Sequence, residues 1–370
     1  MKIGTKLSGF IYDLELRWNK FKSLSTRDKF FFFGDFLVRN AIYIIIILVV
    51  IRVQLHSIEN NFANRFVSFK SIIDILQRAA SALFLALGIG GIIVLTGTDL
   101  SAGRIMGFTA CVCASLLQQP LELYGAKMFP ALNAPPIYLV IILSMAIGAI
   151  FGLFNGFMTA KFKLHPFIVT LATQLILYGM VLMYVQLGTN GGGPISGLTD
   201  EYKNVVKETV NLAGTAIPMY VFYAIIAAVI MWFIWNKTTL GKNMYAVGAN
   251  PEAANVSGIS VMKTTILVFV MGGIFYGISG FIEAARIGSN SPTTGVNAEL
   301  DAIAACVIGG VSFTGGIGTI RGIITGVILL QVIGVALQWL GVSPDVQYIF
   351  KGAIILTAVA IDMRKYLAKK

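Results

Sequence analysis

The sequence has little charge, few histidines and few cysteines. Only 12% of its 370 residues are charged, about half the share of an average soluble domain, whereas 56% are hydrophobic. A soluble chain of this length would need more polar residues to cover its surface. A disordered chain is excluded as well, because disordered chains are poor in apolar residues. The composition therefore indicates a polytopic membrane protein.

The rare chemistry-bearing residues form no metal or catalytic cluster. His56 and His165 lie far apart, and Cys111, Cys113 and Cys306 all lie in apolar runs. Their spacing fits no zinc site, so we expect the cysteines to be small buried residues. No G-x-x-x-x-G-K-[ST] loop occurs in the chain, so it cannot bind ATP by that motif. The sequence predicts no catalytic residue, no metal site and no cofactor in this chain.

Long apolar runs predict an all-α fold of about ten transmembrane helices, because one spanning helix needs roughly 20 mostly apolar residues. The expected spans are about 40–55, 82–97, 105–117, 137–160, 166–187, 218–235, 264–285, 300–309, 317–340 and 348–361. An amphipathic stretch at 66–81 precedes the second span. The longest polar connection between spans, 188–217, contains three consecutive glycines at 191–193.

The basic residues predict the orientation. Residues 1–39 hold eight lysines and arginines against four acidic residues, and the last seven residues hold four more. Basic tails favour the cytoplasmic side, so both ends are expected there, which agrees with an even number of spans. We expect a cytoplasmic amphipathic segment at 1–39, a membrane domain at 40–361 and a basic cytoplasmic tail at 362–370. Loops 161–165 and 236–263 then fall inside, and 188–217 outside.

A short self-capped helix is predicted inside loop 236–263. Asn250 is a good N-cap, Pro251 suits the first helical position and Glu252 complements the helix dipole. Gly258 can adopt the left-handed conformation that ends a helix. Such a helix could dock in a partner's groove or lie on the membrane surface, and the sequence leaves both open.

Two glycine-flanked breaks interrupt the apolar runs. In the first, Gly97 and Gly103 bracket polar residues, which are Thr98, Asp99, Ser101 and, just beyond, Arg104. The break could line a solute path, because polar groups at membrane depth usually face a cavity. It could equally be a tight cytoplasmic turn in which Asp99 caps the next helix and Arg104 faces lipid headgroups.

The second break holds Gly310, Gly315 and Gly316 together with Ser312 and Thr314. It resembles the first faintly, which suggests either an internal repeat of the kind found in transporters or chance similarity. We expect a packed reverse turn close to loop 236–263 or to a dimer axis.

Four further charged residues are predicted at the outer face. Glu283 and Arg286 end one span, and Glu299 and Asp301 begin another. They could simply solvate helix ends, or they could form a gate or a docking surface.

Several segments resemble a known family of membrane proteins. Glu252, Ala253 and Ala254, followed by Gly258, resemble the "EAA" coupling loop of ABC importer permeases, although the usual downstream Leu-Pro is missing. Residues 94–104, 235–259, 283–289, 299–319 and 347–355 closely resemble galactose/methyl-galactoside permeases of the ribose/xylose/galactoside family of sugar importers. The resemblance runs from about residue 80 to the C-terminus and does not include the first 35 or so residues.

The resemblance implies a permease with a type II-like architecture, similar to the vitamin B12 importer, in the bacterial inner membrane. It implies a homodimer, a separate sugar ATPase with two nucleotide-binding domains that holds ATP and Mg²⁺, and a periplasmic or lipid-anchored sugar-binding protein. Residues 250–254 and Gly258 would then receive the push of the ATPase. Ribose, another monosaccharide or a nucleoside could replace galactosides. An ion-coupled secondary sugar transporter is the alternative of another class. It would need an ionisable group deep in a span, for which Arg52 is the nearest candidate.

Overall fold

The computed structural model describes residues 41–60, 65–120, 127–212 and 214–367, so the expected segment 1–39 lies outside the described residues. Contacts divide the chain into units 1–49 and 50–370, and every contact discussed below lies within the second unit. The helices are α3 (Ala41–Glu59), α4 (Phe69–Val94), α5 (Ala102–Leu116), α6 (Ile137–Phe162), α7 (Pro166–Tyr184), α8 (Asp200–Lys207), α9 (Met219–Lys237), α10 (Thr239–Ala249), α11 (Pro251–Val256), α12 (Val261–Ile287), α13 (Ala298–Ile308), α14 (Ile320–Trp339) and α15 (Pro344–Leu367).

Six helices are long and apolar enough to cross a membrane within the described residues. They are α4, α6, α7, α9, α12 and α14. The helices α5 and α13 have 15 and 11 residues, or about 22 and 16 Å at ~1.5 Å per residue. Neither crosses a hydrocarbon core of about 30 Å alone. The expectation that 105–117 and 300–309 each form a span is therefore not confirmed.

The second expected span is longer than the sequence suggested. Residues 66–81 and 82–97, predicted as separate segments, are joined by the single helix α4, which covers 69–94. Ser68 caps it by accepting a hydrogen bond from the Ser71 amide at 3.3 Å. No glycine or proline occurs between residues 69 and 87, so nothing in the chain interrupts the helix where its hydropathy changes.

The connection 188–217 contains ordered elements that amend the all-α expectation. It holds α8 and an antiparallel hairpin of β1 (Thr209–Leu212) and β2 (Thr215–Pro218), with Thr209 opposite Pro218. The side chain of Tyr202 on α8 is fully buried, and its hydroxyl donates to the Phe281 carbonyl of α12. The connection is thus anchored on the end of α12.

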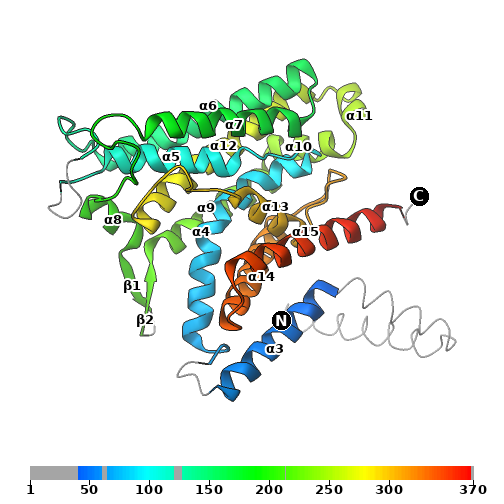
Figure 1. Ribbon diagram of the computed structural model, residues 1–370. Helices are drawn as coiled ribbons and strands as arrows, with labels where there is room; N and C mark the ends of the chain where they lie inside the picture. Colours follow the sequence, from blue (N-terminus) through cyan, green and yellow to red (C-terminus); the bar gives the residue numbers. More distant parts are fainter. Residues whose placement is uncertain (1–40, 61–64, 121–126, 213, 368–370) are drawn as a thin grey trace, which may run out of the picture. The chain divides into compact units, whose positions relative to one another are not determined.

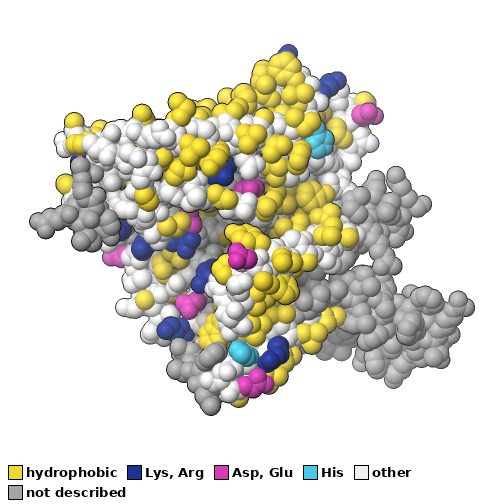
Figure 2. Space-filling view, in the orientation of Figure 1, with side chains coloured by type: hydrophobic (Ala, Val, Ile, Leu, Met, Phe, Trp, Pro, Cys, Tyr) yellow, Lys and Arg dark blue, Asp and Glu magenta, His cyan; other side chains and the backbone are white. Residues whose placement is uncertain are grey.

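The centre of the second unit is the pair α6 and α12, held together by glycines. A methyl group at Gly148 would overlap the carbonyl oxygen of Gly273, and one at Gly277 would overlap that of Ser144. Small residues allow this approach where helices pack in a membrane. Figure 1 shows α6 and α7 side by side, and Figure 2 shows hydrophobic side chains gathered over them. These exposed apolar faces suit contact with lipid.

Candidate functional site

A polar cavity of about 620 Å³ lies among α4, α5, α9, α12, α13 and α14. Its volume falls within the ~300–1,000 Å³ of small-molecule sites. Most of the residues that line it are polar or charged, namely Asp74, Gln77, Arg78, Ser81, Tyr220, Ser279, Glu283, Arg286, Asp301 and Gln331. In a chain with 12% charge, five charged side chains around one cavity are a strong concentration. Figure 2 shows charged side chains around a hollow in the middle of the face drawn.

The first turns of α4 supply four of these side chains. Asp74, Gln77, Arg78 and Ser81 recur at intervals of three and four residues, which places them on one face of a helix. The sequence pattern marked 66–81 as amphipathic, but no partner was assigned to its polar face, so the site was missed. The spacing itself was the signal that could have found it.

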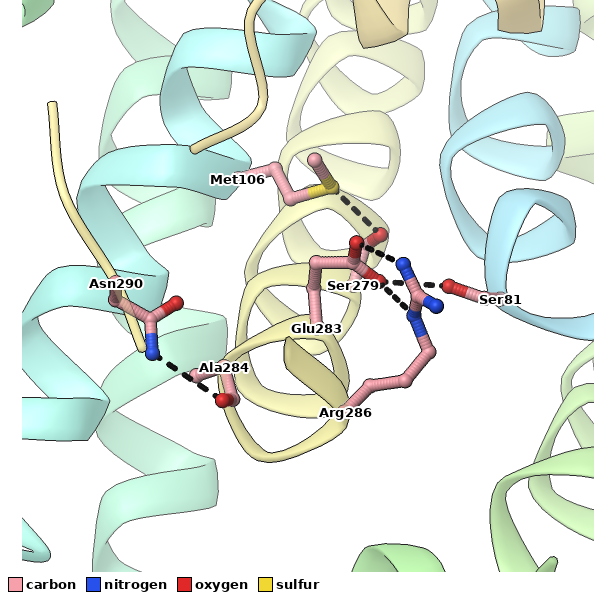
Figure 3. Close-up of polar contacts among 7 residues, drawn as sticks. All are labelled: Ser81, Met106, Ser279, Glu283, Ala284, Arg286 and Asn290. Atoms are coloured by element: carbon pink, nitrogen blue, oxygen red, sulfur yellow. Dashed lines mark hydrogen bonds and ion pairs between the residues drawn. The ribbon is translucent and has the colours of Figure 1, made fainter. Parts of the chain in front are cut away.

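A hydrogen-bonded cluster joins α4 to the last turns of α12 beside the cavity (Figure 3). The Arg286 guanidinium donates through Nη2 to Glu283 Oε1 at 2.6 Å and through Nε to Oε2 at 2.7 Å. The Ser81 hydroxyl donates to the same Oε2 at 2.7 Å from α4. A two-pronged pair of this kind fixes geometry as well as charge. Glu283 and Arg286 therefore also link the end of α12 to α4.

Another lining residue, Asp301, belongs to a second ion pair. The Lys351 ammonium of α15 lies 2.7 Å from Asp301 Oδ2 on α13. The cavity thus presents carboxylates, guanidinium groups, amides and hydroxyls together. This mixture can donate to and accept from a neutral polyhydroxylated solute, and nothing in it favours one sign of charge.

The first break lies apart from this cavity and is buried. The Asp99 side chain is fully buried, and its Oδ1 accepts from the Ser101 amide at 2.9 Å and the Ser101 hydroxyl at 2.6 Å. Asp99 therefore orders the turn directly before α5, which starts at Ala102. Thr98, Asp99, Ser101 and Arg104 do not line the cavity, and a role of these residues in the solute path stays a prediction.

Side chains from two further helices extend this network. Asn155 of α6 donates to the Ser101 hydroxyl at 2.9 Å and accepts from Thr173 of α7 at 2.6 Å. The Thr170 hydroxyl of α7 donates to the Thr98 carbonyl at 3.2 Å. Four buried side chains, Asp99, Ser101, Asn155 and Thr173, thus tie the break to α6 and α7.

The two charged residues beside the break are also engaged by protein. Arg104 donates to the Pro292 carbonyl at 2.8 Å, and its guanidinium lies 4.4 Å from the centre of the Tyr178 ring. Glu299, expected at the outer surface, is only 2% exposed. A methyl group at Gly103 would overlap its carboxylate, so Gly103 provides space for a buried acid rather than for a turn. At the other end of the break, Gly97 is buried and its amide donates to Ile92.

The second break lies against α10. The Ser312 and Thr314 hydroxyls are 2.8 Å apart, and neither residue lines the cavity. Gly310, Gly315 and Gly316 have φ angles of +83°, +84° and +68°, a conformation that favours glycine. The Gly316 amide donates to the Val94 carbonyl at the end of α4 at 2.9 Å. The second break therefore contacts the end of α4, three residues before the first break begins at Gly97.

The self-capped helix expected in loop 236–263 is confirmed as α11. Asn250 Oδ1 accepts from the Ala253 amide at 3.0 Å, Pro251 is its first residue, and Gly258 has a φ of +83°. The Ile259 amide donates to the Ala254 carbonyl at 3.0 Å, which completes a Schellman-type end. Glu252, Ala253 and Gly258 are exposed, whereas Ala254 is buried. Helix α10 precedes α11 and was not predicted.

The connection 188–217 carries exposed charge on α8. The hydrogen bond and charge of Lys203, 2.6 Å from Asp200, hold the pKa of that carboxyl below its ordinary value. Burial instead raises the pKa of the Tyr202 hydroxyl. Asp200 is thus ionised at neutral pH and available on the exposed side of α8.

Comparison with known proteins identifies related sequences. The model of a family described as "Branched-chain amino acid transport system / permease component" matches residues 71–359. The galactose/methyl galactoside import permease protein MglC of Escherichia coli is 46% identical over 305 residues, which are 82% of this chain and 90% of the relative. The protein of the same description from Haemophilus influenzae is 43% identical over 338 residues, 91% of this chain and 97% of the relative.

A more distant relative is named for a different sugar. The ribose import permease protein RbsC of Escherichia coli is 33% identical over 316 residues, 84% of this chain and 90% of the relative. No solved structure matches the chain.

Proposed function

Because the chain belongs to the family described as branched-chain amino acid transport system / permease component, we propose that it is the membrane-spanning permease of an ATP-driven sugar importer. Six apolar helices and relatives that are import permeases indicate an integral membrane protein. The solute, the partners and the transport cycle below are parts of the proposal.

The polar lining of the cavity favours a sugar over a branched-chain amino acid as the solute. A branched-chain amino acid has an apolar side chain, which cannot hydrogen-bond with polar lining residues such as Gln77, Tyr220 and Gln331. A sugar can pair with them. Galactose or a methyl galactoside is the proposed solute, because the relatives with 43–46% identity are import permeases for these sugars by name. Ribose, another monosaccharide or a nucleoside is the alternative within the same class.

The proposed cycle is alternating access. A loaded sugar-binding protein, periplasmic or lipid-anchored, docks on outer loops that include 188–217. ATP binding and hydrolysis in a separate chain with two nucleotide-binding domains move α11, and the sugar passes through the polar cavity. Solute affinity resides in the binding protein, so the cavity needs to bind sugar only weakly.

The proposed assembly follows the same logic. We place about ten transmembrane helices in each subunit, of which α5 and α13 each cross only part of the membrane, with both termini cytoplasmic, a coupling loop at 236–263 and an amphipathic segment at 1–39. The basic tail at 362–370 faces the cytoplasm. A second copy of the chain completes a type II-like pore in the inner membrane. The exposed apolar faces and the basic tails support this arrangement.

Reconstitution tests the function. The chain is placed in liposomes with the candidate ATPase and binding protein, and uptake of labelled galactose, methyl galactoside, ribose and leucine is measured. The expected result is ATP-dependent galactoside uptake that requires both partners. Leucine as the preferred solute would refute the choice of a sugar. Sugar uptake that follows an ion gradient without the ATPase would favour a secondary transporter.

A matched pair of variants tests the role of α11. Glu252 and Glu201 each lie in the first turn of a short helix and are exposed, so replacing either by lysine perturbs the helix dipole alike. We expect Glu252→Lys to weaken ATPase association in a pull-down while Glu201→Lys leaves it unchanged. Equal retention of the ATPase by both variants would show that α11 is only a surface helix.

A further inference from the structure

Backbone meets backbone where α10 ends. The Gly316 amide of the second break donates to the Val94 carbonyl, the last residue of α4. Gly248, one residue before the end of α10, is buried between them. Val94, Gly248, Gly315 and Gly316 together form what we name the glycine junction.

No side chain separates the three segments in the glycine junction. A methyl group at Gly248 would overlap the Val94 carbonyl oxygen and lie 2.8 Å from the Gly316 nitrogen. A methyl group at Gly315 would overlap the Gly248 carbonyl oxygen. Side chains can change rotamer and absorb a displacement, whereas close-packed backbone transmits it. The junction is therefore a stiff contact.

A tyrosine makes a second contact between α10 and the segment of the second break. The Tyr245 hydroxyl of α10 donates to the Gly318 carbonyl at 2.8 Å. Its ring packs edge-on against Trp235 of α9, with 5.9 Å between ring centres. The second break cannot move away from α10 without losing both this hydrogen bond and the glycine contacts.

The junction lies between the coupling helix and the cavity walls. Gly248 is two residues before Asn250, the cap of α11. On the other side, Leu85 lines the cavity nine residues before Val94 on α4, a distance of about 14 Å along a helix. Ala302 of α13 lines the cavity seven residues before Gly309, where the second break starts.

We propose that a displacement of α11 reaches the cavity-lining helices α4 and α13 through the glycine junction, with Gly248 and Tyr245 as positioning residues. This rests on the proposed function of the chain as an ATP-driven permease. It adds the route by which the ATPase moves the cavity, and it makes a backbone contact, rather than a salt bridge, the transmitting element.

The test measures sugar molecules imported per ATP hydrolysed in the complete reconstituted complex. Gly248→Ala forces a methyl group into the junction, and we expect the ratio to fall about tenfold or more, as overpacking of a tight site predicts. Tyr245→Phe removes one hydrogen bond without adding volume, and we expect a fall of about threefold. The matched control is Gly179→Ala on α7, where nothing lies within 4 Å of the added methyl, and it should match the wild type.

The ratio separates coupling from folding, because a variant that merely folds poorly loses uptake and stimulated hydrolysis together. If Gly248→Ala does not accumulate, Tyr245→Phe decides alone. A wild-type ratio in Tyr245→Phe, or in a folded Gly248→Ala, overturns the inference while leaving the proposed function standing. A wild-type complex without ATP-driven uptake instead refutes the proposed function.

Discussion

Replacing Asp99 separates two roles that the first break could have. The carboxylate accepts two hydrogen bonds through Oδ1, from the amide and the hydroxyl of Ser101. Asparagine keeps that oxygen, whereas alanine removes it. If Asp99 holds the turn before α5, Asp99→Asn should preserve uptake and Asp99→Ala should lose it. If its negative charge contacts the solute, both variants should fail.

The loss of stability expected for each variant follows from the hydrogen bonds of Asp99. Asp99→Ala leaves the buried Ser101 amide without an acceptor, which costs about 1–3 kcal/mol. The Ser101 hydroxyl loses its acceptor as well, a hydrogen bond worth about 0.5–1.5 kcal/mol, although Asn155 still donates to that hydroxyl. The sum is about 2–4 kcal/mol. Asp99→Asn retains both bonds, so we expect it to cost less than about 1 kcal/mol.

The assay combines thermal unfolding in detergent with uptake per folded permease. Asp99→Asn should unfold near the wild-type temperature and import sugar at the wild-type rate, and Asp99→Ala should unfold earlier. A stable Asp99→Asn variant with uptake lowered more than tenfold would refute the structural role and place the charge in the solute path. A thiol reagent gives an independent reading, because the native cysteines are buried. It should label Gln77→Cys in the cavity and leave Asp99→Cys unmodified.

Two more substitutions probe the cavity and the core. Glu283→Gln removes the negative charge that binds Arg286 and Ser81. We expect severalfold lower sugar uptake and normal ATPase association in a pull-down. Wild-type uptake would show that the cluster only solvates the helix end. Gly148→Ala on α6 overlaps the backbone of α12 and should lower stability in thermal unfolding by about 1–3 kcal/mol. Gly179→Ala is its control, because open space surrounds the new methyl group and alanine favours the helix by up to about 1 kcal/mol. Equal stability of the two variants would contradict the close contact between α6 and α12 at Gly148.

Features that depend on neighbouring residues could be predicted from the sequence. The cap, first residue and end of α11 are encoded by Asn250, Pro251 and Gly258, which act within nine residues of one another. Capping depends on short-range hydrogen bonds, so it survives without knowledge of the fold. The bounds of α6 and α12 followed similarly from long apolar runs that end at polar residues.

The cavity could not be predicted from the sequence, because its lining residues come together only when the helices pack. Ser81 and Glu283 are 202 residues apart in the chain, and no local pattern relates them. The polar face of α4 was also misleading. A run of Asp74, Gln77 and Arg78 lowers the hydropathy of a window in the same way whether it faces water, a loop or an internal cavity. The prediction consequently divided one helix into an amphipathic stretch and a separate span.

The same limitation hid how the two breaks differ. Their sequences resemble each other, yet the first is held by side chains, from Asp99 through Asn155 to Thr173, whereas the second is held by backbone at Gly315 and Gly316. A side-chain network anchors its break to α6 and α7, and a backbone contact links the other break to the helix that leads to α11. The second break contacts α4 at Val94, three residues before Gly97, so this end of α4 lies between the side-chain network and the contact with α10. Its polar turns at Gln77 and Ser81 lie on the same continuous helix. Between residues 69 and 87 α4 has no glycine or proline, so the half that lines the cavity moves as one piece. A shift at Val94 reaches that half through Gly88, Gly90 and Gly91, and the tight packing of these glycines against neighbouring helices limits bending there.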